Sequence, residues 1–162
     1  MKQFRGSLDR AIDLAFARKR YIFFLGIKGL GKHYAIYAYA KKRNLKCTKL
    51  DDRLPTDSEV LYIVDDLSNR SFLESLCQFL SEQDHYLVCF ISEQFLPDYF
   101  YGLLLSRIQI FSAKEFLFSL QDCQQYLKSE HLTDEDVSEI YEKSEGCVFA
   151  LRYHLMKKRD MI

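Results

Sequence analysis

The chain has 162 residues, 48 % of them hydrophobic, which indicates one domain with a buried core, or one domain with a small appendage. Its 23 basic and 23 acidic residues balance, and without a long basic block we expect this segment to make no direct nucleic acid contact. Residues 1–20 are too charged for a signal peptide, and the apolar stretches are shorter than the ~20 residues of a membrane span.

Cysteine usage points to a reducing compartment. None of the cysteines forms a C-x-x-C pair, their number is odd, and most lie in apolar runs; they are Cys47, Cys77, Cys89, Cys123 and Cys147. We therefore expect buried, reduced thiols in a cytoplasmic protein that contacts no membrane.

The amino-terminal residues predict a helix followed by a buried strand. Apolar residues recur at helical spacing through Ser7–Arg18, and Ser7 is a suitable cap. Tyr21–Leu25 is apolar at every position, which is typical of a strand covered on both faces.

The next segment, Gly26–Lys32, fits the phosphate-binding pattern G-x-x-x-x-G-K between a predicted strand and a predicted helix over 32–44. Glycines allow backbone N–H groups to surround phosphate oxygens, the helix N-terminus adds partial positive charge, and Lys32 can reach the outer phosphates. The candidate nucleotide-binding residues of this loop are Gly26, Lys28, Gly29, Leu30, Gly31 and Lys32, with a solvated Lys28 side chain as the alternative.

His33 departs from this pattern, which normally ends in a Ser or Thr whose hydroxyl binds Mg²⁺. An imidazole cannot reproduce the short contact of a hard oxygen with Mg²⁺. His33 either points away from the site or donates a hydrogen bond to an α- or β-phosphate, so we include it among the binding candidates. Nucleotide binding is accordingly better supported than hydrolysis.

Two carboxylates follow the third predicted strand. Strands are predicted over 46–50 and 60–64, and Asp65-Asp66 comes directly after the second of these. In nucleoside triphosphatases a carboxylate at such a strand end holds Mg²⁺, and its neighbour orients the attacking water. We assign Asp65 to the metal and Asp66 to the water, with capping of the next helix, or a position in solvent, as the alternatives.

The remaining pattern completes a parallel α/β sheet. A helix is predicted over 71–82 and strands over 86–91 and 107–111, so strands alternate with helices. Ser92 closes the fourth strand and is either a γ-phosphate sensor or a plain strand terminus. Arg107 is the nearest candidate for extra positive charge at the site, with a surface position as the alternative. We predict a parallel five-stranded P-loop NTPase sheet, flanked by helices, over residues 1–112.

Residues 113–162 lack strand patterns and predict a small helical lid subdomain, which this segment includes in part. Helices are expected over 119–129, 133–143 and 147–158. Ser119 and Thr133 each precede acidic residues, as capping residues do at helix starts.

This carboxyl-terminal third resembles the helical module of MalT-type, LuxR-family transcriptional regulators, which are signal-transduction (STAND) ATPases related to the AAA+ class. The resemblance rests on Phe118–Cys123, Leu132–Val137 and Ser144–Arg152, and extends over the loop and Asp65-Asp66. It implies ATP binding by Gly29, Gly31 and Lys32, metal and water roles for Asp65 and Asp66, and a lid contact to the adenine side at Gly146. It also implies ATP-driven self-association and further domains, including a DNA-binding one beyond this segment.

The chain departs from that family at several positions. His33 replaces the hydroxyl residue, Glu93 stands in place of an arginine, and Cys147-Val148 replaces Trp-Pro. Repulsion between Glu93 and a triphosphate costs about 1–4 kcal/mol depending on screening, and ~1.4 kcal/mol already weakens binding tenfold.

These features favour an ATP- or ADP-binding switch domain of a MalT/LuxR-like regulator, with Mg²⁺ as a further candidate ligand and at most weak ATPase activity. The alternative is a degenerate P-loop domain that acts as a nucleotide-independent interaction scaffold. A small-molecule kinase is a third hypothesis, which the sparse arginines of the lid, Arg152 and Arg159, disfavour.

Overall fold

The computed structural model describes residues 6–98, 100, 102 and 105–161. Five parallel strands form one sheet in the order β2-β3-β4-β1-β5. The strands are β1 (Tyr21–Leu25), β2 (Lys46–Lys49), β3 (Val60–Val64), β4 (Leu87–Ser92) and β5 (Ile108–Phe111). All five coincide with predicted strands to within one residue; the signal is strongest in β1, β3 and β4, which contain runs of four or more apolar residues.

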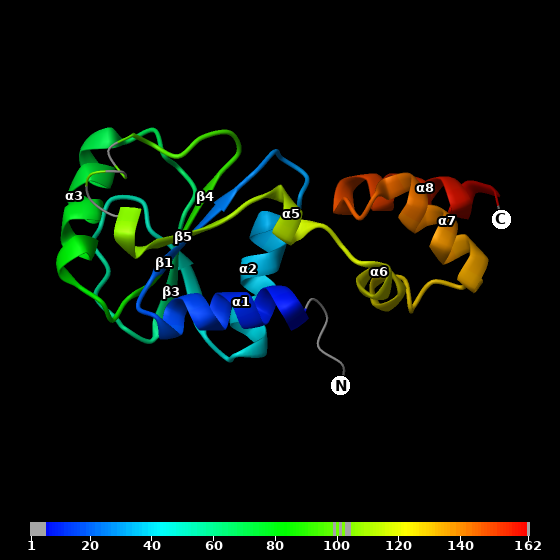
Figure 1. The fold of residues 1–162 in the computed structure, drawn as a ribbon, viewed down its shortest axis with the longest axis horizontal. Helices are drawn as coiled ribbons and strands as arrows, with labels where there is room; N and C mark the ends of the chain where they lie inside the picture. Colours follow the sequence, from blue (N-terminus) through cyan, green and yellow to red (C-terminus); the bar gives the residue numbers. More distant parts are fainter. Residues whose placement is uncertain (1–5, 99, 101, 103–104, 162) are drawn as a thin grey trace.

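Helices surround this sheet and continue beyond it (Figure 1). They are α1 (Gly6–Ala17), α2 (Lys32–Lys42), α3 (Arg70–Glu82), η1 (Leu105–Arg107), α5 (Ala113–Phe116), α6 (Leu120–Tyr126), α7 (Asp134–Ser144) and α8 (Val148–Met161). Neither η1 nor the single turn α5 was expected, since three or four residues are too few to show helical periodicity; a capping box between Ser112 and Glu115 holds α5.

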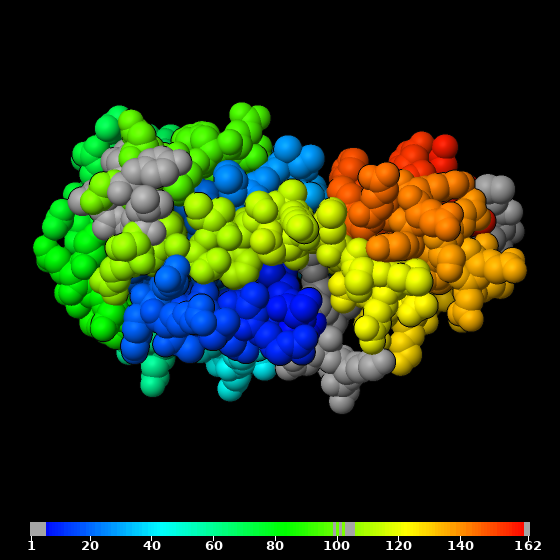
Figure 2. Space-filling view, viewed as in Figure 1, coloured from blue at the N-terminus to red at the C-terminus, as the bar shows by residue number. Residues whose placement is uncertain are grey.

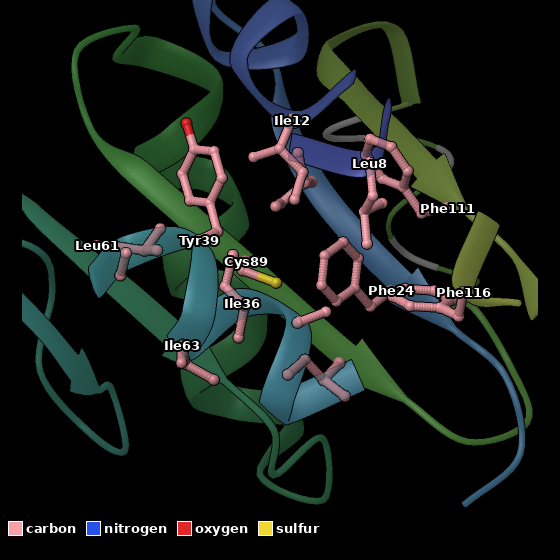
Figure 3. Packing of buried hydrophobic residues seen from close by; sticks show 14 of the residues in the cluster. Leu8, Ile12, Phe24, Ile36, Tyr39, Leu61, Ile63, Cys89, Phe111 and Phe116 are labelled. Atoms are coloured by element: carbon pink, nitrogen blue, oxygen red, sulfur yellow. The ribbon is translucent and has the colours of Figure 1, made fainter. Parts of the chain in front are cut away.

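Successive residues of β1 face opposite layers of the core. Ile22 and Phe24 point into a cluster with α1 and α2, whereas Tyr21 and Phe23 point into a second cluster with α3. Figure 3 shows the first cluster, in which Phe24 lies beside Phe111 and Phe116, with ring centroids 5.6 and 4.6 Å away. Burial of both faces explains why this strand carries no polar residue.

Residues after α5 pack around a hydrophobic cluster of their own. It contains Phe118, Cys123, Leu127, Val137, Ile140, Val148, Leu151 and Leu155. Capping boxes at Ser119 and Thr133 start α6 and α7, as predicted. Figure 2 shows these helices, coloured yellow to red, as a lobe at one end of the molecule. We call residues 118–161 the lid; because Phe116 packs with the sheet, a division after residue 112 stays a proposal.

One backbone contact joins the first residue of the lid to the segment just before α8. The Phe118 N–H donates to the Gly146 carbonyl at 2.8 Å. A Cβ at Gly146 would lie 2.3 Å from the Phe118 carbonyl oxygen, and φ there is +83°. Only glycine allows this close approach, which fixes where α8 begins relative to the segment that leaves the sheet.

Candidate functional site

The glycine loop joins β1 to α2 and has the backbone that its sequence requires. Gly29 and Gly31 have φ values of +96° and +82°, in the left-handed region that favours glycine. Gly31 precedes the first residue of α2. The first N–H groups of α2 have no partner within the helix and lie at the end of this loop, which is the arrangement that binds anions.

Lys32 is almost fully buried, with 5 % of its surface exposed. Its ammonium donates hydrogen bonds to the carbonyls of Gly26 and Ile27, the latter at 2.9 Å. Burial lowers the pKa of Lys32, and the negative charge of Glu93 acts in the opposite direction. The loop thus holds the ammonium group of Lys32 against its own backbone carbonyls.

A cleft of about 610 Å³ opens beside this loop. Its walls come from the loop and α2, from the segments after β3 and β4, and from the lid. The predicted site residues that line it are Lys28, Gly29, Gly31, Lys32, His33, Asp65, Asp66 and Ser92. They meet because β1, β3 and β4 are parallel and adjacent, so the segments after these strands lie at one edge of the sheet.

Three predicted binding residues lie outside the lining of this cleft. The Gly26 N–H donates to the Ser92 carbonyl at 3.1 Å, and its own carbonyl accepts from Lys32. Leu30 is buried in the core cluster under α2. Gly146 packs against Phe118, and the residues of α8 that follow it line the cleft instead.

Asp65 is held by two side chains from different elements. Its Oδ2 atom lies 3.0 Å from Lys49 Nζ and 3.0 Å from His33 Nε2. Burial alone would raise the pKa of Asp65, but the hydrogen bonds from Lys49 and His33 outweigh burial and lower it. Asp65 is therefore ionised, and the positive charge of Lys49 balances its negative charge in the wall of the cleft.

Asp66 instead organises the turn that leads to α3. Its Oδ1 atom accepts hydrogen bonds from the N–H and the hydroxyl of Ser68, and these bonds lower the pKa of Asp66. The cap of α3 itself is Asn69, which accepts from the Phe72 N–H at 3.2 Å. Neither aspartate caps α3, so that alternative does not describe this structure.

Ser92 is the last residue of β4, Glu93 follows it, and both line the cleft. The Ser92 hydroxyl accepts a hydrogen bond from the Phe95 N–H at 3.4 Å. Glu93 therefore adds a negative charge to the lining of the cleft. From the sequence, this charge was expected near the phosphates of a nucleotide.

Arg107 lies at the opposite edge of the sheet. Its Nη1 atom donates to the carbonyls of Leu80 and Ser81 at 3.0 and 2.9 Å, and its guanidinium lies 5.4 Å from the centre of the Tyr21 ring. Arg107 precedes β5, and in a parallel sheet that position faces away from a cleft at the carboxyl ends of the strands. It therefore adds no charge to the cleft.

The lid contributes cleft residues that were not among the predicted site residues: Tyr126, Val148, Phe149 and Arg152. Arg152 Nε donates to the Tyr126 hydroxyl at 2.9 Å, and this bond raises the pKa of Arg152. A Cβ at Gly29 would lie 3.1 Å from the Phe149 Cβ, so the start of α8 touches the glycine loop. Arg152 could be recognised in the sequence as an arginine of the lid. Its approach to the cleft could not be predicted, because it depends on how the lid packs.

Within the described residues, 6–98, 100, 102 and 105–161, no group of three or more His, Cys, Asp or Glu side chains is arranged to hold a metal ion. Likewise, none of the helices over those residues combines the length and apolarity that crossing a membrane requires.

Comparisons with known proteins support the fold. No family model and no curated protein matches the chain. Three solved structures of RuvB variants from Thermotoga maritima are similar, with TM-scores of 0.64, 0.59 and 0.58 at 13–14 % identity. They align with 98 % of this chain, which spans only 61–62 % of theirs. RuvB is an AAA+ P-loop ATPase, and the predicted fold class, a five-stranded P-loop sheet with a helical lid, is confirmed.

Proposed function

We propose that this chain is the nucleotide-binding switch domain of a MalT/LuxR-like transcriptional regulator, which binds ATP or ADP in the cleft and hydrolyses ATP slowly or not at all. Its partners are the nucleotide, other domains of a longer regulator and, through the nucleotide-bound state, further copies of itself. The observation that carries the binding proposal is the meeting of the glycine loop and the first turns of α8 around one cleft.

The charges of the cleft suit a polyphosphate. Lys28, Lys32 and Arg152 line it, and the N-termini of two helices, α2 and α8, reach it. A helix N-terminus carries about half a positive charge, and backbone N–H groups there donate to phosphate oxygens. When a nucleotide binds, the Lys32 ammonium donates to phosphate oxygens in place of the carbonyls of Gly26 and Ile27.

The contact between lid and loop is the basis of the proposed switch. Val148 and Phe149 lie against the positions of Gly31 and Gly29, so a nucleotide that reshapes the loop also acts on the start of α8. A change in α8 alters the lid surface that is offered to neighbouring domains, which is how such transitions propagate.

Slow or absent hydrolysis follows from the acidic residues. Asp66, the proposed water-orienting carboxylate, is engaged by Ser68, and Asp65, the proposed metal ligand, is engaged by Lys49 and His33. Glu93 adds negative charge beside the phosphates. The residues around Asp65 fit a bound nucleotide better than they fit Mg²⁺.

Thermal denaturation with and without millimolar ATP or ADP tests the binding proposal. A ligand at about 100 times its Kd stabilises the folded chain by about 2.7 kcal/mol, which raises Tm by about 5–10 °C in a domain of this size. We expect Lys32→Ala to abolish the shift, and Lys41→Ala, an exposed lysine of the same helix, to preserve it.

The scaffold hypothesis predicts the opposite result. It is favoured by one observation, the presence of Glu93 in the wall of the cleft. If neither nucleotide shifts Tm, or if the shift survives Lys32→Ala, the chain is a nucleotide-independent interaction scaffold and our proposal is wrong.

A further inference from the structure

Three residues meet at the point of the cleft where a divalent cation would be expected. His33 lies in the first turn of α2, Asp65 follows β3, and Lys49 is the last residue of β2. Both nitrogen atoms, Lys49 Nζ and His33 Nε2, lie 3.0 Å from the same carboxylate oxygen, Oδ2 of Asp65. The pairing of β2 with β3, in which Lys49 stands beside Ile63, brings the lysine to this edge.

These contacts oppose a magnesium ion at Asp65. Mg²⁺ requires oxygen ligands in near-octahedral geometry at about 2.0–2.1 Å. The Oδ2 oxygen already accepts from two N–H donors, one of them a full positive charge, and position 33 offers a ring nitrogen in place of a hydroxyl oxygen. A cation at this oxygen would have to displace the ammonium of Lys49 or lie against it.

The same contacts make a cation unnecessary. An ionised carboxylate is only an acceptor, so His33 Nε2 carries the hydrogen in this bond, and both partners of Asp65 are donors. Lys49 therefore cancels the negative charge that Asp65 would otherwise present to the phosphates. A bound Mg²⁺ would perform this neutralisation in a metal-dependent site.

We propose that this chain binds its nucleotide without a divalent cation, because the ammonium of Lys49, with His33, neutralises Asp65 in the place of the metal. The inference rests on the proposed nucleotide binding and concerns the regulation of the same cleft. Lys49 acts through Asp65 and is a positioning residue, and its side chain is 54 % exposed, so replacing it should leave the core intact.

Isothermal titration calorimetry with ATP, in excess Mg²⁺ and in excess EDTA, tests this inference. We expect ATP to bind more tightly in EDTA than in Mg²⁺, or to bind more weakly by no more than about threefold in Kd. A larger loss of affinity in EDTA would overturn the inference while leaving the proposed nucleotide binding intact. Absence of binding under both conditions would overturn both.

Variants of Lys49 separate neutralisation from a merely structural role. Lys49→Ala should weaken ATP binding in EDTA by about tenfold, and Mg²⁺ should restore part of that loss. The matched control is Lys46→Ala, which removes an exposed lysine from the same strand and should bind ATP as the native chain does. Circular dichroism confirms that each variant is folded.

A second substitution, Asp65→Asn, completes a double-mutant cycle with Lys49→Ala. If Lys49 acts by cancelling the charge of Asp65, adding Asp65→Asn to Lys49→Ala should restore ATP binding in EDTA to within about threefold of the native Kd. Native affinity of Lys49→Ala in EDTA, or failure of Asp65→Asn to restore binding, would contradict the inference.

Discussion

Arg152 and Tyr126 are joined across the lid by a 2.9 Å hydrogen bond from the guanidinium Nε to the phenol oxygen. The two residues come from α8 and α6, and both line the cleft. The bond uses one edge of the guanidinium and leaves its Nη atoms to donate to a ligand. Arg152 thus lines the cleft from the lid, and the glycine loop lines the same cleft from the end of β1.

We expect Arg152→Ala to weaken ATP binding by about tenfold or more, because a hydrogen bond to a charged group contributes about 1.5–3 kcal/mol. Arg159→Ala is the matched control, since that arginine belongs to the same helix and pairs with Glu130. Calorimetric titration of both variants measures the effect. Native affinity of Arg152→Ala, beside a loss of binding in Lys32→Ala, would place the nucleotide away from the lid.

Glu93→Gln should tighten ATP binding. The carboxylate lines the cleft, and its repulsion of a triphosphate costs about 1–4 kcal/mol, so removing it predicts an affinity gain of about fivefold or more at low ionic strength. The gain should shrink as salt is added, because salt screens exposed charges.

Fluorescence titration over a salt series measures this dependence, with Glu142→Gln on the exposed face of α7 as the control. An unchanged Kd for Glu93→Gln at low salt would show that the carboxylate lies too far from the phosphates to matter.

Gly29→Ala should destabilise the folded chain by about 1–2 kcal/mol, because alanine is strained in the left-handed region. Its Cβ would also lie 3.1 Å from the Phe149 Cβ, so Phe149 would have to move by a few tenths of an ångström. Gly102→Ala is the control, since a Cβ there meets nothing within 4 Å. Urea denaturation compares the two variants, and equal stabilities would refute the predicted strain.

Tyr21 should make stability sensitive to alkaline pH. Burial raises the pKa of Tyr21 from 10.0 to about 12, and its hydroxyl donates to the Leu80 carbonyl at 3.0 Å. The neutral phenol is favoured in the folded chain, so this stabilisation is complete below pH 10 and is lost as pH rises from about 10 to about 12.

Tyr21→Phe should cost about 1 kcal/mol at neutral pH, and this difference from the native chain should shrink across that interval. Urea denaturation at several pH values measures it. Tyr153→Phe, at an exposed position of α8, should show no such trend. A difference between Tyr21→Phe and the native chain that stays constant up to pH 12 would refute the assignment.

Much of the core was predictable because its signals are local. Tyr21–Leu25 is apolar at every position, and Gly29 and Gly31 precede Lys32, so strand, loop and helix follow one another as expected. Asp65 and Ser92 were also predicted as site residues from their places at the ends of strands, and both line the cleft. Gly146 was assigned to the site through the family resemblance, and in the structure its backbone instead meets that of Phe118.

The sequence by itself determined the strands, the left-handed glycine positions and the candidate carboxylates, because each depends on neighbouring residues and on backbone sterics. Only the tertiary structure decided which side chains meet at the cleft. The strand order places Lys49 beside Asp65, and the packing of α8 brings Phe149 to the glycine loop and Arg152 to the cleft. Those encounters join residues far apart in the chain, and the free energy of packing whole elements selects them.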